Sequence, residues 1–509
     1  MATATKDAAV GEISFETNLT AMPTKKETSK AALQKYIGFP LGLIIFALLY
    51  YMPAPSGLTM EGQAAMACFA AALVWWVLEP FPTYVTSLVL LGMLTVYSGW
   101  EEKQIFGVLG LEVIWLNILS FILCSTLVKT QLAKRVALWM GVKWGRNSLL
   151  ILLAFLGLQL LMAPFIPATM ARTMMVLPVM LVIAQVYGST AENNNNFGVN
   201  LFMQNLQGIS IFSSAFLTGS TCNIVAAAFI YEMGGHKVYY SEWMFGMLPI
   251  TIVAMLISWW IGPKFIAPIA KEDRQPRVKG GITHMQKLLE EMGRLSFDEK
   301  RAGGIFFLVL FLWATDQYHV GWFGFEISAV MAALIGAVIA FLPKVGLLKW
   351  NDCDIPWHTM IFSAGAYAGG LSLYNSGAAR WVVGTIFEAI GLQKGASFAV
   401  VYMIIITFCM FAHLFFTSKT MRSIIMIPII ITIARELGFP PVALALPAAF
   451  TLTWVITLPT NAKPNLVLYS TGQFSIADNL KYGLTMCAVG AALLIVAGFT
   501  WFKVLGITP

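Results

Sequence analysis

Long apolar runs alternate with short polar stretches along nearly the whole chain. Nine of them are long enough, as single helices, to cross about 30 Å of hydrocarbon. They lie near residues 37–53, 61–78, 83–99, 111–129, 242–268, 303–318, 325–342, 357–374 and 480–503. None has the roughly ten-residue alternation of a membrane β-barrel. The pattern therefore predicts an all-α polytopic membrane protein.

Two further apolar segments are long enough for two helices each, but each has a polar break at its middle. Residues 148–187 are interrupted by PATMAR at 167–172, and residues 396–436 are interrupted by TSKTMR at 417–422. Such a segment enters the bilayer, turns at mid-depth and returns to the side from which it came. We therefore expect each of them to be a re-entrant helical hairpin.

Two more segments, 201–233 and 441–472, are predicted to be broken membrane helices. Their interruptions read TGSTCN at 218–223 and LPTNAKPN at 458–465. The Gly, Pro and Asn residues in these stretches unwind a helix. Each broken helix follows one of the two hairpins in the chain.

The two halves of the chain repeat one design. Arg172 precedes Pro178 by six residues in the first hairpin, and Arg422 precedes Pro428 by six in the second. A basic amphipathic stretch comes before each hairpin, and a broken helix comes after it. The period is near 250 residues, or about half the chain. Chance likeness of two apolar halves is the alternative, and the shared order of the features favours an internal repeat.

Lysine and arginine indicate which helix ends face the cytoplasm. The N-terminal tail and the polar segment 264–301 are rich in both, which predicts a cytoplasmic location for each. With hairpins that return to their own side, the chain crosses the membrane about eleven times and its second half is inverted. Inverted repeats with broken helices are typical of secondary transporters. The predicted divisions are a cytosolic tail (1–35), a first membrane helix (36–54), a first repeat (55–270), a cytoplasmic linker (271–302) and a second repeat (303–509).

Composition agrees with a membrane-embedded chain. Of the 509 residues 58% are hydrophobic and only 11% are charged, and the mean hydropathy is +0.75. The net charge of +7 does not predict nucleic-acid binding, because the basic residues gather in a few loops, as the positive-inside rule requires. The six cysteines are scattered without CxxC pairs, which argues against a disulfide framework and against a metal site.

The four breaks are where polar chemistry is expected in the middle of the membrane. A helix that resumes after a break presents free N–H groups and about half a positive charge, which suits an oxyanion. Hydroxyl and amide side chains gather at these points and supply directional hydrogen bonds. The candidate substrate-binding residues are Ala168, Thr169, Ser220, Thr221, Asn223, Ser418, Lys419, Thr420, Thr460, Asn461, Pro464 and Asn465.

The charges at the breaks favour an anionic substrate. No acidic residue lies at any of the four breaks, whereas cation carriers usually have carboxylates in the membrane. The basic residues there are Arg172, Lys419, Arg422 and Lys463. In the alternative each cation snorkels to a membrane surface, which applies most readily to the two arginines after the hairpin tips.

From residue 36 onward the chain resembles the divalent anion:sodium symporter (DASS) family of di- and tricarboxylate transporters. Members of that family carry Ser-Asn-Thr at two hairpin tips, often followed by Ala-Arg, and a late break that contains Pro-Asn. Here the tips read ATM at 168–170, followed by Ala-Arg, and SKT at 418–420, and the late break reads AKPNLVLYSTG at 462–472. The resemblance implies an elevator-type transporter that forms a homodimer.

The tips depart from the family pattern in an informative way. In sodium-coupled relatives bound Na⁺ compensates the charge of the carboxylates. Lys419 stands where Asn is usual, so we expect its ammonium group to replace one sodium ion, and Lys463 to act likewise, without a cofactor. Moving an empty site with unpaired cations is costly. This favours sodium-independent obligatory exchange of C4 or C5 dicarboxylates (succinate, malate, 2-oxoglutarate). The alternative is a sodium-coupled di- or tricarboxylate symporter.

Other classes of protein fit less well. The chain has five histidines, no HExxH or GxSxG motif and no paired acids in the apolar runs, so an enzyme is not expected. A channel rarely needs broken hairpins in inverted halves. We expect a multi-pass protein of the plasma membrane, the inner membrane of a bacterium. An organelle envelope is the alternative, although the tail has no evident transit peptide.

Overall fold

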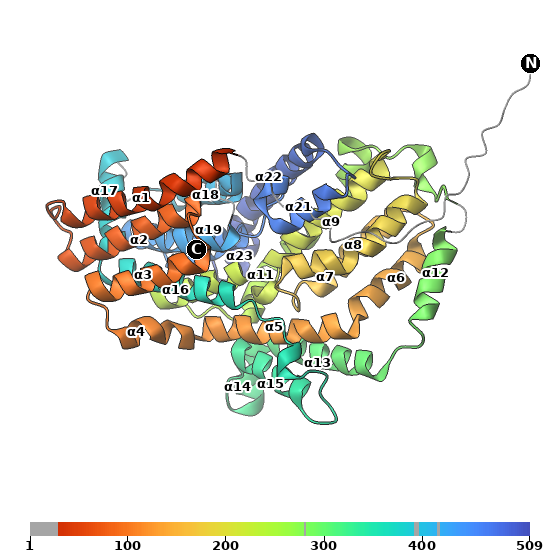
Figure 1. Ribbon diagram of the computed structural model, residues 1–509, viewed down its shortest axis with the longest axis horizontal. Coiled ribbons are helices and arrows are strands. Elements are labelled where there is room, and N and C mark those ends of the chain that lie inside the picture. The colour runs from red at the N-terminus through yellow and green to blue at the C-terminus, as the bar shows by residue number, and fades with distance from the viewer. Residues whose placement is uncertain (1–28, 279–280, 391–395, 415–417) are drawn as a thin grey trace, which may run out of the picture.

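The computed structural model describes residues 29–278, 281–390, 396–414 and 418–509, and every regular element in these ranges is a helix (Figure 1). Most of the predicted tail lies outside them. The first half contains α1 (Ser29–Tyr51), α2 (Met60–Leu78), α3 (Thr83–Tyr97), α4 (Glu102–Gly107), α5 (Glu112–Thr130), α6 (Leu132–Trp144), α7 (Ser148–Met162), α8 (Thr169–Val186), α9 (Asn196–Ser214), α10 (Thr221–Gly234) and α11 (Tyr240–Ile261).

The second half follows after the linker and has the same order of long and interrupted helices. Its helices are α12 (Gly281–Glu291), α13 (Phe297–Ala314), α14 (His319–Phe323), α15 (Ala329–Phe341), α16 (Trp357–Asn375), α17 (Ala378–Ile390), α18 (Phe398–Phe411), α19 (Lys419–Leu437), α20 (Pro441–Phe450), α21 (Lys463–Ser470), α22 (Ile476–Phe499) and α23 (Trp501–Val504).

Each of the nine predicted continuous spans overlaps over most of its length with one helix of the structure. Five helical stretches of the described residues are long and apolar enough to cross a membrane. They are Met60–Leu78, Glu102–Thr130, Thr169–Val186, Tyr240–Ile266 and Ile476–Val504. Several of the remaining apolar helices are shorter, such as the hairpin arm α7. The predicted re-entrant arm would need only part of the bilayer thickness.

Helices α1 and α13 begin six or more residues earlier than the sequence pattern predicts. Helix α1 begins at Ser29 instead of residue 36, because the residues before the apolar run are good helix formers, mainly Ala, Leu, Gln and Lys. Helix α13 begins at Phe297, inside the predicted linker 271–302. The Ser296 hydroxyl accepts a hydrogen bond from the Glu299 amide at 3.1 Å, and the Glu299 carboxylate accepts one from the Ser296 amide at 2.7 Å. This capping box sets the start of α13.

The two hairpins pack across the two halves. Helices α7 and α8 are the arms of the first predicted hairpin, and α8 packs on α9 of its own half and on α21 of the other half. Helices α18 and α19 are the arms of the second predicted hairpin, and α19 packs on α20 of its own half and on α10 of the other. The yellow and blue ribbons therefore lie side by side in Figure 1. These helices form one compact unit, in which α8 and α19 each contact the helix before one break and the helix after the other.

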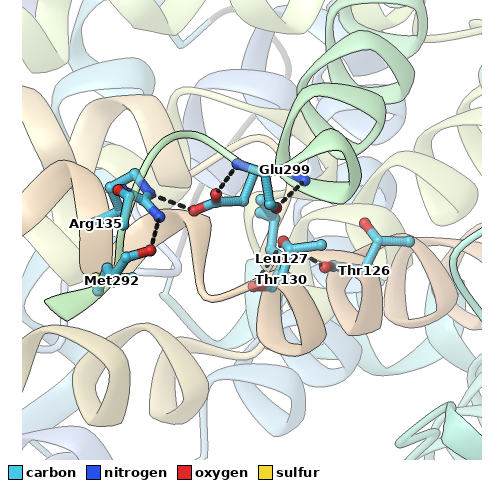
Figure 2. Close-up of polar contacts among 8 residues, drawn as sticks. Thr126, Leu127, Thr130, Arg135, Met292 and Glu299 are labelled. Carbon is cyan, nitrogen blue, oxygen red and sulfur yellow. Dashed lines mark hydrogen bonds and ion pairs between the residues drawn. The ribbon is translucent and has the colours of Figure 1, made fainter.

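The linker is fastened to the first half by Arg135 of α6 (Figure 2). Its Nε donates to Glu299 Oε1 at 2.5 Å, and its Nη2 donates to the Met292 carbonyl at 2.9 Å. Burial opposes ionisation of Glu299, but the hydrogen bonds from Arg135 and from Ser296 outweigh it and lower the pKa of this carboxyl. The linker end, α6 and the start of α13 are thus held together.

Candidate functional site

A cavity of about 850 Å³ lies where the two hairpin tips meet the two broken helices. Side chains from both halves line it, together with the end of α5 and the loop before α16. Nine of the residues singled out in the sequence line this cavity: Ala168, Thr169, Ser220, Thr221, Lys419, Thr420, Asn461, Lys463 and Pro464. Residues more than 290 positions apart in the chain are thus brought to one site.

Two of the candidate asparagines lie outside the cavity lining. The Asn223 side chain is buried and donates to the carbonyls of Ser213 and Phe216, at 2.8 and 2.9 Å. The Asn465 side chain donates in the same way to the carbonyls of Val455 and Leu458, at 2.7 and 3.3 Å. Each amide therefore satisfies carbonyls that the break leaves without a helical partner. They do not line the cavity but hold its two breaks in shape.

The other two candidates also lie outside the cavity lining. The Ser418 hydroxyl accepts a hydrogen bond from the Met421 amide at 3.2 Å and caps the start of α19. Thr460 is exposed. Ser418 therefore fixes the direction of the helix that carries Lys419, which is a supporting position.

The break in the first half also requires a glycine. The chain between α9 and α10 folds into a short 3₁₀ turn, Leu217–Gly219. A Cβ atom added to Gly219 would lie 2.3 Å from the Ser213 carbonyl oxygen, which is closer than any carbon can approach. The lack of a side chain at Gly219 thus permits the tight break that exposes the start of α10.

Both arginines after the hairpin tips are fully buried and point away from the cavity. Arg172 Nη2 donates to the Ile209 carbonyl at 2.6 Å and to the Ser213 hydroxyl. Arg422 Nη2 donates to the Thr451 carbonyl at 3.1 Å and to the Leu452 carbonyl. The alternative that these cations snorkel to a membrane surface is therefore wrong. They bind the carbonyl ends of the helices that precede the breaks, where the helix dipole is negative.

These matching contacts show which residues of the first half correspond to which residues of the second. Thr169 and Lys419 are the first residues of α8 and α19, and each lies three positions before its buried arginine. Thr221 and Lys463 are the first residues of α10 and α21, and each lies two positions before the asparagine that holds its break. All four side chains line the cavity. Thr169 thus corresponds to Lys419, and Thr221 corresponds to Lys463.

The two lysines differ in their surroundings. The ammonium nitrogen of Lys419 is buried and finds no hydrogen-bond partner within the described parts of the chain. Lys463 is exposed and lines the open part of the cavity wall. A buried ammonium group without a partner is unfavourable, and an anion in the cavity would supply that partner.

The rim of the cavity carries charged residues that the sequence patterns did not single out. Lys129 Nζ, near the end of α5, lies 2.7 Å from Asp352 Oδ2. This hydrogen bond lowers the pKa of Asp352. Asp354 also lines the rim, and its backbone amide donates to the Ser125 hydroxyl at 3.2 Å. No local signal marked these residues, because Asp352 and Asp354 lie in an ordinary polar loop.

The backbone of a buried histidine holds the side chain of Asn461. The carbonyl of His413 accepts a hydrogen bond from Asn461 Nδ2 at 2.6 Å, and His413 Nε2 lies 2.9 Å from Thr457 Oγ1. His413 is fully buried. Among the described residues no group of three or more His, Cys, Asp or Glu side chains is arranged to hold a metal ion.

Sequence comparison identifies the family of this chain. The family model described as "Sodium:sulfate symporter transmembrane region" matches residues 33–508. The chain belongs to this family. The membership of the DASS family expected from the hairpin tips and the late break is thereby confirmed. It is a membrane protein of a transporter family.

Individual relatives agree with this assignment. The chain is 26% identical over 500 residues to the sodium-dependent dicarboxylate transporter SdcS of Staphylococcus saprophyticus, covering 95% of this chain and 94% of that protein. It is 24% identical over 493 residues to SdcS of Staphylococcus aureus, covering 94% and 93%. The solved structure of MtrF from Neisseria gonorrhoeae, described as one of a class of antimetabolite efflux pumps, aligns with a TM-score of 0.55 at 14% identity, covering 92% and 95%. This last likeness concerns the fold alone.

Proposed function

We propose that this chain is a secondary active transporter that exchanges C4 or C5 dicarboxylates, of the succinate, malate and 2-oxoglutarate class, without sodium. The observation that carries the proposal is the buried, unpartnered ammonium group of Lys419, a residue that lines the cavity between both hairpin tips and both breaks. The names of the SdcS relatives support a dicarboxylate as the substrate. Candidate ligands are Thr169, Ser220, Thr221, Thr420 and Asn461, with Lys419 and Lys463 in the place of mobile cations.

Fixed charge favours exchange over one-way transport. With a dianion bound, the charges of Lys419 and Lys463 are compensated, whereas the empty cavity holds them unpaired. Moving the empty cavity through a low-dielectric barrier is therefore slower than moving the loaded one. A carrier that returns only when loaded is an obligatory exchanger.

We further propose that the chain crosses the membrane about eleven times, forms a homodimer and transports by an elevator movement. The hairpins and broken helices pack as one unit, which is what an elevator needs to carry a site as a body. The rim residue Lys129 lies in the last turn of α5, three positions before the start of α6, to which the linker is fastened by Arg135. With the linker in the cytoplasm, the cavity opens inward in a plasma membrane of bacterial type.

The test uses purified protein in liposomes loaded with succinate in sodium-free buffer. We expect uptake of labelled 2-oxoglutarate into these liposomes, and about the same rate when Na⁺ is supplied. Liposomes without internal dicarboxylate should show little uptake. Liposomes loaded with chloride at the same concentration of anionic charge, with the osmolarity balanced by sucrose, control for osmotic and charge effects. Uptake that needs Na⁺ and ignores internal succinate would contradict exchange.

Sodium-coupled symport is the second candidate, and the names of the relatives favour it. SdcS of both staphylococci is described as sodium-dependent. The first half of the cavity has hydroxyl groups and no lysine at its helix starts, so it retains oxygen atoms of the kind that Na⁺ prefers. The same liposome assay separates the two candidates.

A further inference from the structure

The unpaired positive charge of the cavity lies on one side only. The cations that line it within the described residues are Lys129, Lys419 and Lys463. Lys129 is paired with Asp352 at the rim, 2.7 Å away. The other two belong to the second repeat. The lining contributed by the first hairpin and the first break, Pro167–Ala171 with Met174, Ser220 and Thr221, contains no charged side chain.

The charged and uncharged residues stand at corresponding positions of the two halves. Where the second half has Lys419, the first has Thr169, and where the second has Lys463, the first has Thr221. Ser220 adds another hydroxyl at the first break. We call Lys419 and Lys463 the ammonium pole, and Thr169, Ser220 and Thr221 the hydroxyl pole.

The two poles recognise different chemistry. An ammonium group has three donors and no acceptor, and its hydrogen bonds to an ionised partner are roughly twice as strong as neutral ones. A hydroxyl group both donates and accepts. It therefore pairs with a carboxylate, with a carboxylic acid or with an amide. The ammonium pole requires a charged end of the substrate, whereas the hydroxyl pole requires only a polar one.

We infer that the cavity binds the two ends of its substrate unequally, with an ionised carboxylate at the ammonium pole and any hydrogen-bonding end at the hydroxyl pole. This inference rests on the proposed function, because it names the substrate class of the same site. The ligands that bind the cavity then include the monoamides of C4 dicarboxylic acids and singly protonated dicarboxylates, in addition to the dianions that are exchanged.

Competition against labelled succinate exchange in liposomes tests the inference. Succinamate keeps one carboxylate and one amide, butyrate keeps one carboxylate with an apolar end, and succinamide has no charge. We expect succinamate to inhibit within about fivefold of succinate, butyrate about tenfold more weakly than succinamate, and succinamide about 50-fold more weakly than succinate. Succinamate that is as weak as succinamide would overturn the inference, as would butyrate that equals succinamate.

Two substitutions assign the poles. Thr169→Lys places a second ammonium group in the hydroxyl pole, so the preference for succinate over succinamate should rise about tenfold. Thr221→Lys should do the same at the other helix start. Thr190→Lys is the matched control at an exposed loop position and should leave the ratio unchanged. If both cavity variants keep the wild-type ratio, the proposed poles are wrong.

The assay also separates this inference from the proposed function. Absence of any succinate exchange by the wild-type protein would overturn the proposed function, and the inference with it. Normal succinate exchange with no inhibition by succinamate would overturn the inference alone. Because the competition ratio is measured on the fraction of protein that transports, a lower yield of a variant does not change it.

Discussion

Arg172 and Arg422 occupy matching places in the two halves of the protein. Each is fully buried, and each donates from Nη2 to a backbone carbonyl at the end of the helix before a break, that of Ile209 in the first half and that of Thr451 in the second. The same bond thus joins each hairpin to the broken helix of its own half. It also explains why an arginine follows both hairpin tips.

Arg422→Met should lower the stability of the protein. The substitution keeps most of the side-chain volume but leaves carbonyls at the end of α20 without this donor, which costs ~1–3 kcal/mol of the free energy of unfolding. Arg172→Met should have a similar effect, because its contacts match. Thermal unfolding in detergent measures both. Arg146→Met, at an exposed position, is the control, and unfolding temperatures equal to that of the control would contradict the anchoring role.

Lys419→Asn should make transport depend on sodium. Removing the ammonium group eliminates the proposed charge-assisted hydrogen bond to the substrate, so exchange without sodium should fall about tenfold or more. Added Na⁺ should restore part of the rate, because asparagine is the residue usual in sodium-coupled members of the family. Rates with and without Na⁺ in loaded liposomes provide the measurement. An Asn variant as active as Lys103→Asn, an exposed control on α4, would remove Lys419 from the mechanism.

Asp352→Asn should strengthen the binding of dicarboxylates at low salt. The substitution removes one negative charge from the rim and leaves Lys129 unpaired, so the mouth of the cavity becomes more attractive to anions. Because the removed charge is exposed and screened by solvent, the change of Kd should be small, about two- to fivefold. Binding measured at low and at high ionic strength should show the gain fading with salt. Lys129→Gln should act in the opposite direction, and weaker binding by both variants would contradict the electrostatic account.

His236 should contribute to stability mainly at low pH. It lies in the turn between α10 and α11, and its Nε2 is 2.9 Å from Glu242 Oε1. The hydrogen bond to Glu242 raises the pKa of His236 above 6.5, although partial burial opposes this. A raised pKa means that the contribution is fully present below the ordinary value and is lost as the pH rises through the raised one.

The unfolding temperatures of the wild type and of His236→Gln, measured from pH 5.5 to pH 9, test this. The difference between them should be largest near the acidic end and should disappear toward the alkaline end. Glu242→Gln should abolish the same pH dependence, because it removes the partner of the imidazolium. A difference that grows with rising pH would show that the sign is wrong.

The sequence by itself determined the helices and the breaks between them. The length of an apolar run and the position of a Gly, Pro or Asn are local properties, and a bilayer leaves a backbone few alternatives to a helix. The tips at Thr169 and Lys419, and the breaks at Thr221 and Lys463, could therefore be located before any packing was known.

Only the tertiary structure decided which side chains face the cavity. Asn223 and Asn465 stand at the breaks, as the sequence indicates, but they turn toward backbone carbonyls and not toward the cavity. Lys129 and Asp352 meet at the rim although they are 223 positions apart. Side-chain direction depends on how helices from both halves pack and on which carbonyls each break leaves free, and neither is written in a local pattern of residues.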